Sequence, residues 1–141
     1  MSDDFERAVR FVLEHEGGYV NRADDCGGET KYGISRRAYP GLDIKNLTEQ
    51  DAVDIYKRDY WNKAGCNEMP WPMCLVVLDT AVNLGASRAV EFAGESIGYE
   101  DLIFLRIEHY CNLGRPQFLG GWINRCLDLW KAAKYDEHPF S

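Results

Sequence analysis

The spacing of apolar and polar residues predicts a mainly helical chain. A first helix is expected from Asp3 or Asp4, which can cap it, to about Glu16. Gly17-Gly18 follows at once, and glycine commonly ends helices. Apolar residues recur at helical spacing along the buried face of this segment: Phe5, Ala8, Val9 and Val12.

Several further segments have the pattern of helices. Thr48-Glu49-Gln50-Asp51 has the order of a capping box, with Asp in place of the preferred Glu or Gln, and opens a helix to about Trp61. The segment 73–84 is apolar on nearly every side and is followed by Gly85, which predicts a central, buried helix. The remaining helices are expected at three places: residues 86–94, residues 100–113, and Pro116 to about Ala133.

Between the first two helices the chain is polar and rich in glycine. Residues 17–34 are expected to form a loop that holds a small hairpin, because Tyr19-Val20 and Tyr32-Gly33-Ile34 are its only strand-like pieces. Residues 35–39 look like one helical turn, stopped by Pro40-Gly41. The fold class is therefore mainly α with a small hairpin after the first helix. We expect one domain over residues 1–134 and a loose tail at 135–141.

Length and charge narrow the classes of function. The chain has 141 residues, with 16 Lys and Arg against 23 Asp and Glu, a net charge of −7. This balance argues against a nucleic-acid partner, which normally meets a basic face. No apolar stretch of about 18 residues exists, so no membrane insertion is expected. The acidic N-terminus lacks the hydrophobic region of a signal peptide, so we expect synthesis in the cytoplasm.

Cysteine and histidine patterns give no support for a metal site or cofactor. The five cysteines are irregularly spaced without a CxxC, which favours reduced thiols. His15-Glu16 begins like the HExxH motif of zinc proteases, but position 19 is Tyr and no second His is near. We therefore expect neither a metal nor an organic cofactor.

The candidate chemistry lies in two carboxylates near the end of the first helix. Glu16 at a helix C-terminus meets the negative end of the helix dipole, which together with burial favours the protonated form that a general acid needs. Asp25, on the polar loop nine residues later, can stay ionised, and Thr30 could orient a water between the two. Asp24 and Glu29 are alternatives for the second acid. Equally, Glu16 could be a solvated acid beside a glycine, and Asp25 a turn former.

Other residues could bind a ligand instead of reacting with it. Asp79 and Asn83 lie four apart on one face of an apolar helix, either as core hydrogen-bonding groups or as the lining of a cleft. Trp122 and Arg125 offer an aromatic ring and a cation suited to N-acetyl and carboxylate groups, or else pack between helices. The predicted substrate-binding residues are Tyr32, Trp71, Asp79, Asn83, Trp122 and Arg125.

Several ordered motifs resemble one known family. They are EHEGGY (14–19), GGETKYGIS (27–35), AYP (38–40), DYW (59–61), DTAVNLG (79–85) and GWINR (121–125). Together they resemble the phage and prophage N-acetylmuramidases of glycosyl hydrolase family 108. The resemblance implies a lysozyme-like helical fold and cleavage of the bond between N-acetylmuramic acid and N-acetylglucosamine in peptidoglycan. It also implies Glu16 as the catalytic acid.

A second likeness bears on the other catalytic residues. The order of Glu, an Asp nine residues on, and a Thr before an apolar-Gly-Ile strand resembles the phage T4-type lysozymes, which supports Asp25 and Thr30 as partners of Glu16. Thr30 falls one residue short of the spacing typical there.

The resemblance also implies a biological setting. We expect a monomeric endolysin that cuts peptidoglycan glycan strands in the periplasm after release from the cytoplasm, with a holin-like membrane lesion for delivery. Three alternatives use other chemistry. A lytic transglycosylase would use the same Glu16, an amidase or peptidase would need a metal or Cys–His site, and a wall-binding or phage structural protein would not cut.

Overall fold

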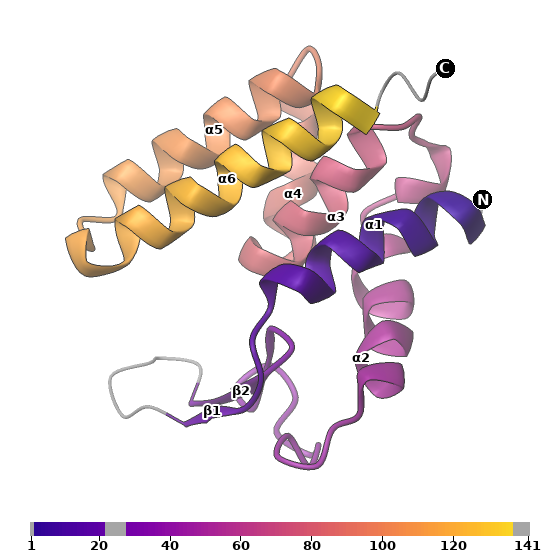
Figure 1. Cartoon of the computed structure of the whole chain (residues 1–141), viewed down its shortest axis with the longest axis vertical. Helices are drawn as coiled ribbons and strands as arrows, with labels where there is room; N and C mark the ends of the chain where they lie inside the picture. The colour runs from indigo at the N-terminus through magenta and orange to yellow at the C-terminus, as the bar shows by residue number, and fades with distance from the viewer. Residues whose placement is uncertain (1, 22–27, 137–141) are drawn as a thin grey trace.

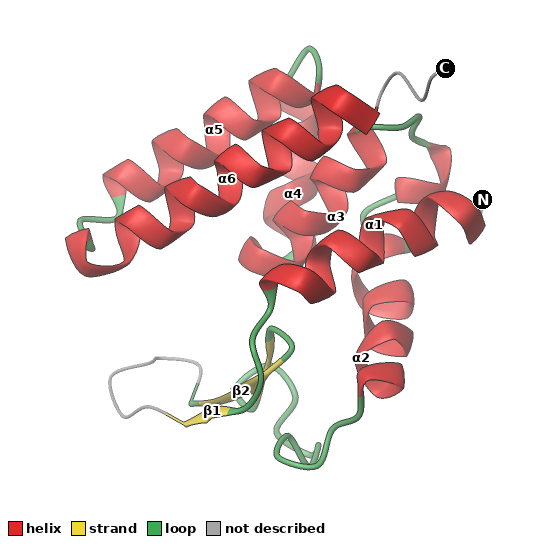
Figure 2. Cartoon of the chain, viewed as in Figure 1, coloured by secondary structure: helices red, strands yellow, loops and turns green. Residues whose placement is uncertain are grey.

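The computed structural model describes residues 2–21 and 28–136 (Figure 1). Helices form one body, and the small sheet follows the first helix at the end of α1 (Figure 2). The helices are α1 (Ser2–His15), α2 (Glu49–Ile55), α3 (Met73–Leu84), α4 (Ala86–Glu95), α5 (Tyr99–Asn112) and α6 (Pro116–Asp136). The mainly helical prediction with a small sheet is therefore confirmed. None of the described helices is long and apolar enough to cross a membrane.

Helix α3 is the centre of the core, as its uniformly apolar sequence predicts. Residues 74–82 are all buried, and the helix packs against α1, α4, α5 and α6. Two polar side chains, Asp79 and Thr80, are buried with this helix. Since buried polar groups need partners, α3 must carry its hydrogen-bonding network inside the protein.

Helix α2 begins as the capping box predicts. Thr48 accepts from the Asp51 N–H at 3.1 Å, and the Asp51 carboxylate accepts from the Thr48 N–H at 3.1 Å. The helix continues into a π-helical segment, η1 (Tyr56–Trp61), in which the Asn62 N–H bonds to the Lys57 carbonyl at 2.9 Å. Single π-turns of this kind are frequent near functional sites because they re-aim side chains. A short 3-10 helix, η2 (Cys66–Glu68), leads towards α3.

The sheet has three antiparallel strands in the order β1-β2-β3: β1 (Val20–Asn21), β2 (Glu29–Lys31) and β3 (Ile34–Ser35). The expectation that Tyr32-Gly33 belong to a strand is wrong, because Lys31 pairs with Ile34 and these two residues form the turn. Their φ angles of 55° and 76° are those of a type I′ hairpin turn. The predicted turn at 35–39 is present as one bond, from the Tyr39 N–H to the Ser35 carbonyl at 3.0 Å.

Helix α6 begins at Pro116, as expected, and continues past Ala133 to Asp136. Tyr135 and Asp136 are therefore helical, which corrects the predicted loose tail at its first two residues. The rest of that tail, 137–141, lies outside the described residues. Helices α5 and α6 run side by side along one edge of the body (Figure 1).

Candidate active site

Glu16 lies where α1 ends and the sheet begins. Its N–H still donates to the Val12 carbonyl at 2.9 Å, so its backbone is held by the last turn of the helix. The side chain is 12% exposed, at the boundary between core and solvent. A rigid helix end thus presents one carboxylate at the edge of the helical body.

The hairpin turn packs directly against this carboxylate. A Cβ placed on Gly33 would lie 2.6 Å from Glu16 Oε1 and 3.2 Å from Val82 Cγ1 of α3. The neighbouring Tyr32 donates its N–H to the Gly17 carbonyl at 3.1 Å, and its own carbonyl accepts from the Tyr56 hydroxyl. Only glycine combines this close approach with a φ of 76°.

The other oxygen of Glu16 meets an arginine from the far end of the chain. Arg125 of α6 donates from Nη1 to Glu16 Oε2, and from Nη2 to Asp79 Oδ1 at 2.6 Å. Arg106 of α5 donates to Asp79 Oδ2 at 2.8 Å. Although burial alone would raise it, the guanidinium groups of Arg125 and Arg106 hold the pKa of Asp79 below its ordinary value. We call Glu16, Arg125, Asp79 and Arg106 the inner network.

Two predicted binding residues extend the inner network. Tyr110 accepts from Arg106 at 2.9 Å and donates to the side-chain oxygen of Asn83. Trp122 stacks on the Tyr110 ring, with 4.9 Å between ring centroids. The structure therefore links Asp79, Asn83, Trp122 and Arg125 in one chain of contacts, of which Arg125 reaches Glu16. Because Asp79 is fully buried with both oxygens bonded to arginine, its role here is internal.

Trp71 lies apart from this group. Its ring is covered by the Arg7 guanidinium, 3.8 Å from the ring centroid, and Arg7 lies nine residues, or about 13 Å of helix, before Glu16. The structure thus does not bring Trp71 to the Glu16 carboxylate.

The predicted second acid falls partly outside the described residues. Asp24 and Asp25 both lie in the segment 22–27. Glu29 is described, and both of its oxygens are engaged: one accepts from the Tyr19 hydroxyl and the other from Arg36 at 2.7 Å. The hydrogen bond from Tyr19, with Arg36, lowers the pKa of Glu29. Thr30, on β2, donates its hydroxyl to the Gly28 carbonyl at 3.2 Å.

The described residues also form a cavity in the size range of small-ligand pockets, and Glu16 is not among the residues that line it. It has a volume of about 760 Å³ and runs between η1 and the junction of α3 with α4. Burial, with the charges of Asp59 and Glu16, raises the pKa of Tyr60, one of its lining residues. Asp59, Tyr60, Lys63 and Ser87 supply its polar lining, together with Tyr39, whose hydroxyl donates to Asp59 at 2.6 Å.

This cavity was not predicted from the chemistry of single residues. Nothing in the spacing of the Asp59-Tyr60-Trp61 motif showed that a π-helical turn would line a cavity with it. The lining of aromatic rings, a carboxylate, an ammonium and a hydroxyl is able to hold a polar, ring-shaped ligand.

The model of one protein family, described as Glycosyl hydrolase 108, matches residues 9–85. The chain belongs to glycosyl hydrolase family 108. The matched range holds Glu16, the sheet and the polar residues of α3, whereas Arg125 of the inner network lies beyond it. This family 108 chain is a lysozyme-like glycoside hydrolase that acts on peptidoglycan.

A solved structure agrees with this assignment. The family 108 chain resembles SagA of Brucella abortus at 28% sequence identity, with a TM-score of 0.84 over 96% of each chain. The likeness therefore extends over α4, α5 and α6, beyond the part that the family model matches. A comparison with curated proteins gives no match.

Proposed function

We propose that this family 108 hydrolase is an N-acetylmuramidase, with Glu16 as the general acid for the leaving glycosidic oxygen. The observation that carries the proposal is the fixed position of the Glu16 carboxylate. One oxygen is packed against Gly33 and the other is held by Arg125. Catalysis by a positioned carboxyl depends on such alignment with the reacting bond.

For the second acid we propose Asp25, with Thr30 orienting the water. Glu29 is less suited, because Tyr19 and Arg36 already occupy both of its oxygens within the sheet. If a water lies between the two acids, their carboxyl groups should be about 6.5–9.5 Å apart and the product inverted at the anomeric carbon. A covalent route would need them about 5 Å apart, with retention.

The residues around Glu16 divide into two proposed roles. Tyr32, Asn83 and Trp122 are each only partly buried, so they can contact the glycan strand. Asp79 acts indirectly, because it accepts a hydrogen bond from Arg125 and so holds Arg125 against Glu16. Arg125 can serve both roles, since its guanidinium is 11% exposed while bonded to both carboxylates.

The test is mass spectrometry of fragments released from purified sacculi by the wild type and by Glu16→Gln. The wild type should release fragments with reducing muramic-acid ends, and the variant should lose about 10²–10⁴-fold in rate because it cannot donate a proton. Glu6→Gln, on an exposed position of the same helix, is the matched control and should keep full activity.

Each other result has a definite meaning. Anhydro ends would make the protein a lytic transglycosylase, and reducing glucosamine ends would make it a glucosaminidase. No release by the wild type, or full activity in folded Glu16→Gln, would overturn the proposal. Asp25→Asn and Glu29→Gln in the same assay identify the second acid, and we expect a large loss only for Asp25→Asn.

We propose further that the enzyme serves as a phage or prophage endolysin. The support is the resemblance of its motifs to that group. Production of the chain in bacterial cytoplasm should leave cells intact until a holin-like protein opens the membrane, and turbidity measurements would show the difference. Lysis without any membrane lesion would contradict this delivery route.

A further inference from the structure

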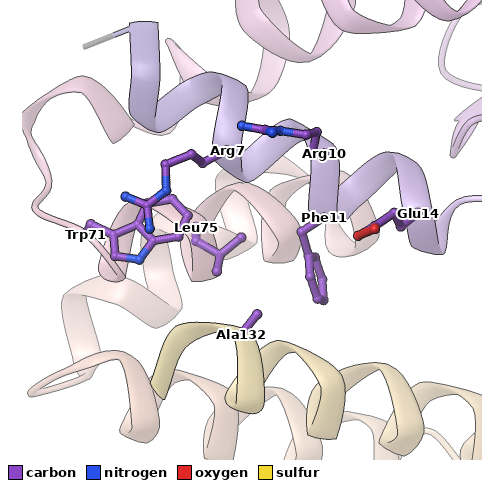
Figure 3. Close-up of a pocket in the computed structure, with 7 residues that line it drawn as sticks. All are labelled: Arg7, Arg10, Phe11, Glu14, Trp71, Leu75 and Ala132. Atoms are coloured by element: carbon purple, nitrogen blue, oxygen red, sulfur yellow. The ribbon is translucent and has the colours of Figure 1, made fainter. Parts of the chain in front are cut away.

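A second cavity, of about 390 Å³, lies between α1, the start of α3 and α6 (Figure 3). It is lined by Arg7, Arg10 and Glu14 of α1, which together with Phe11 form one face of that helix at the spacing i, i+3, i+4, i+7. Glu14 and Glu16 are two residues apart, about 200° around the helix. The cavity therefore opens on a different side of α1 from the catalytic carboxylate.

The charged groups of this cavity have few strong polar partners. Arg7 has a loose ion pair with Asp4, at 3.8 Å, beside its contact with the Trp71 ring, and Arg10 has a long bond from Nε to the Glu6 carbonyl, at 3.4 Å. Within the described part of the chain, no hydrogen bond or ion pair holds the Glu14 carboxylate. Two cations thus gather in one place on a chain with a net charge of −7, together with one available anion.

Phe11 and Trp71 form part of the apolar side of the cavity. Phe11 points towards α6, and Arg7 lies over the Trp71 ring (Figure 3). The indole Nε1 of Trp71 is buried and has no acceptor among the described residues. Because this atom has almost no accessible surface, a ligand in the cavity would meet the ring of Trp71 and not its N–H.

We propose that this cavity binds a peptide of the bacterial wall, an inference that rests on the proposed function. Wall peptides carry several free carboxylates and, on a diamino-acid residue, a free amine. Arg7 and Arg10 match the carboxylates, Glu14 matches the amine, and Phe11 and Trp71 cover the alkyl parts. The enzyme is then held on its substrate by a second contact that leaves the Glu16 carboxylate free for the glycan strand.

The test is calorimetric titration of the full chain with the synthetic tripeptide L-Ala-γ-D-Glu-meso-diaminopimelate. We expect a Kd of about 1 mM, and a further weakening of about tenfold in Arg7→Gln/Arg10→Gln, because both carboxylate partners are removed. Glu14→Gln should weaken binding of the tripeptide, but not binding of the tripeptide acetylated on its diaminopimelate amine. Arg115→Gln, an exposed arginine at the start of α6, is the matched control and should bind as the wild type does.

The catalytic variant separates this inference from the proposed function. Glu16→Gln should lose hydrolysis and keep tripeptide affinity, whereas loss of both would place the peptide at Glu16 and overturn the inference. No binding up to about 10 mM, or equal affinity in the double variant, would also overturn it while leaving hydrolysis intact. If the double variant does not fold, Arg10→Gln alone replaces it, because Arg10 is exposed.

A second measurement reports on Trp71 directly. The indole N–H resonance of Trp71, assigned by its absence in Trp71→Phe, should shift when tripeptide is added to the wild type. An unchanged resonance at saturating tripeptide would contradict the proposed site.

Discussion

Acids are held by arginines in two regions of this enzyme, with opposite surroundings. In the inner network, Asp79 and Arg106 are fully buried, while Glu16 and Arg125 are about nine-tenths buried. In the outer pairs, Arg36 with Glu29 and Arg58 with Asp59, the arginines are 55% and 66% exposed. The bond lengths are alike, 2.7–2.8 Å in Arg106–Asp79, Arg36–Glu29 and Arg58–Asp59. The difference lies in what happens when one partner is lost.

Water replaces a lost partner in the outer pairs but not in the inner network. Exposed ion pairs contribute little for this reason, whereas an uncompensated buried charge is strongly destabilising. The inner network alternates in sign from Glu16 to Arg106, so each charge has an opposite neighbour. Its end at the protein surface is Glu16, so the carboxylate proposed as the general acid is positioned by charges that are buried among the described residues.

The largest effect is expected for Asp79→Asn. The change leaves Arg106 and Arg125 without their shared counter-charge inside the protein, at a cost of about 3–5 kcal/mol of unfolding free energy. Urea unfolding measures the loss. Asp128→Asn, which removes an exposed partner of His15, is the matched control and should change stability far less. Equal losses of unfolding free energy in the two variants would show that the inner network contributes no more to stability than an exposed ion pair.

Gly33→Ala should have the next largest effect. The new methyl group would lie 2.6 Å from Glu16 Oε1, so the carboxylate must move, and misplacement by about 1 Å can cost about 10²-fold in rate. The comparison is Gly28→Ala, because Gly28 has a similar φ of 73° but no atom within 4 Å of an added Cβ. Both variants carry backbone strain of about 1 kcal/mol or more. Rates of peptidoglycan digestion should fall sharply only for Gly33→Ala.

The helices could be predicted from sequence because their signals are local. The Thr48 capping box, the apolar run of α3 and Pro116 at the start of α6 each mark a helix within a few residues. The hairpin turn was harder to predict from the sequence. Tyr32 is an unusual residue at positive φ, and its turn is held from outside, by the Tyr56 hydroxyl.

In the candidate site, too, features with a local sequence pattern could be predicted and contacts between distant residues could not. Glu16 could be singled out from its neighbours in the chain, since a carboxylate before two glycines at a helix end is a local pattern. Its pairing with Arg125 joins residues 109 positions apart, and no local pattern encodes that distance. Likewise, Asp79 and Asn83 could be placed on one face of α3, but their partners Arg106 and Tyr110 come from another helix.

The smallest effect is expected for the outer pair of Asp59, and it depends on pH. The hydrogen bond from Arg58, with that from Tyr39, lowers the pKa of Asp59 from 3.8 to about 2. A carboxyl with a lowered pKa in the folded state stabilises the protein above its unfolded pKa, and this stabilisation is lost as the pH falls towards 2. Because the pair is exposed to solvent, we expect it to contribute only about 1 kcal/mol.

Asp59→Asn tests this contribution by unfolding measurements across pH. The wild type should be more stable than the variant by a constant amount above about pH 5, and the two should converge between about pH 4 and 2 as Asp59 is protonated. Tyr39→Phe, which removes one hydrogen bond but keeps Arg58, should show the same trend with a smaller amplitude. A difference that persists unchanged at pH 2 would mean that the side-chain shape, and not the charge of Asp59, matters at this position.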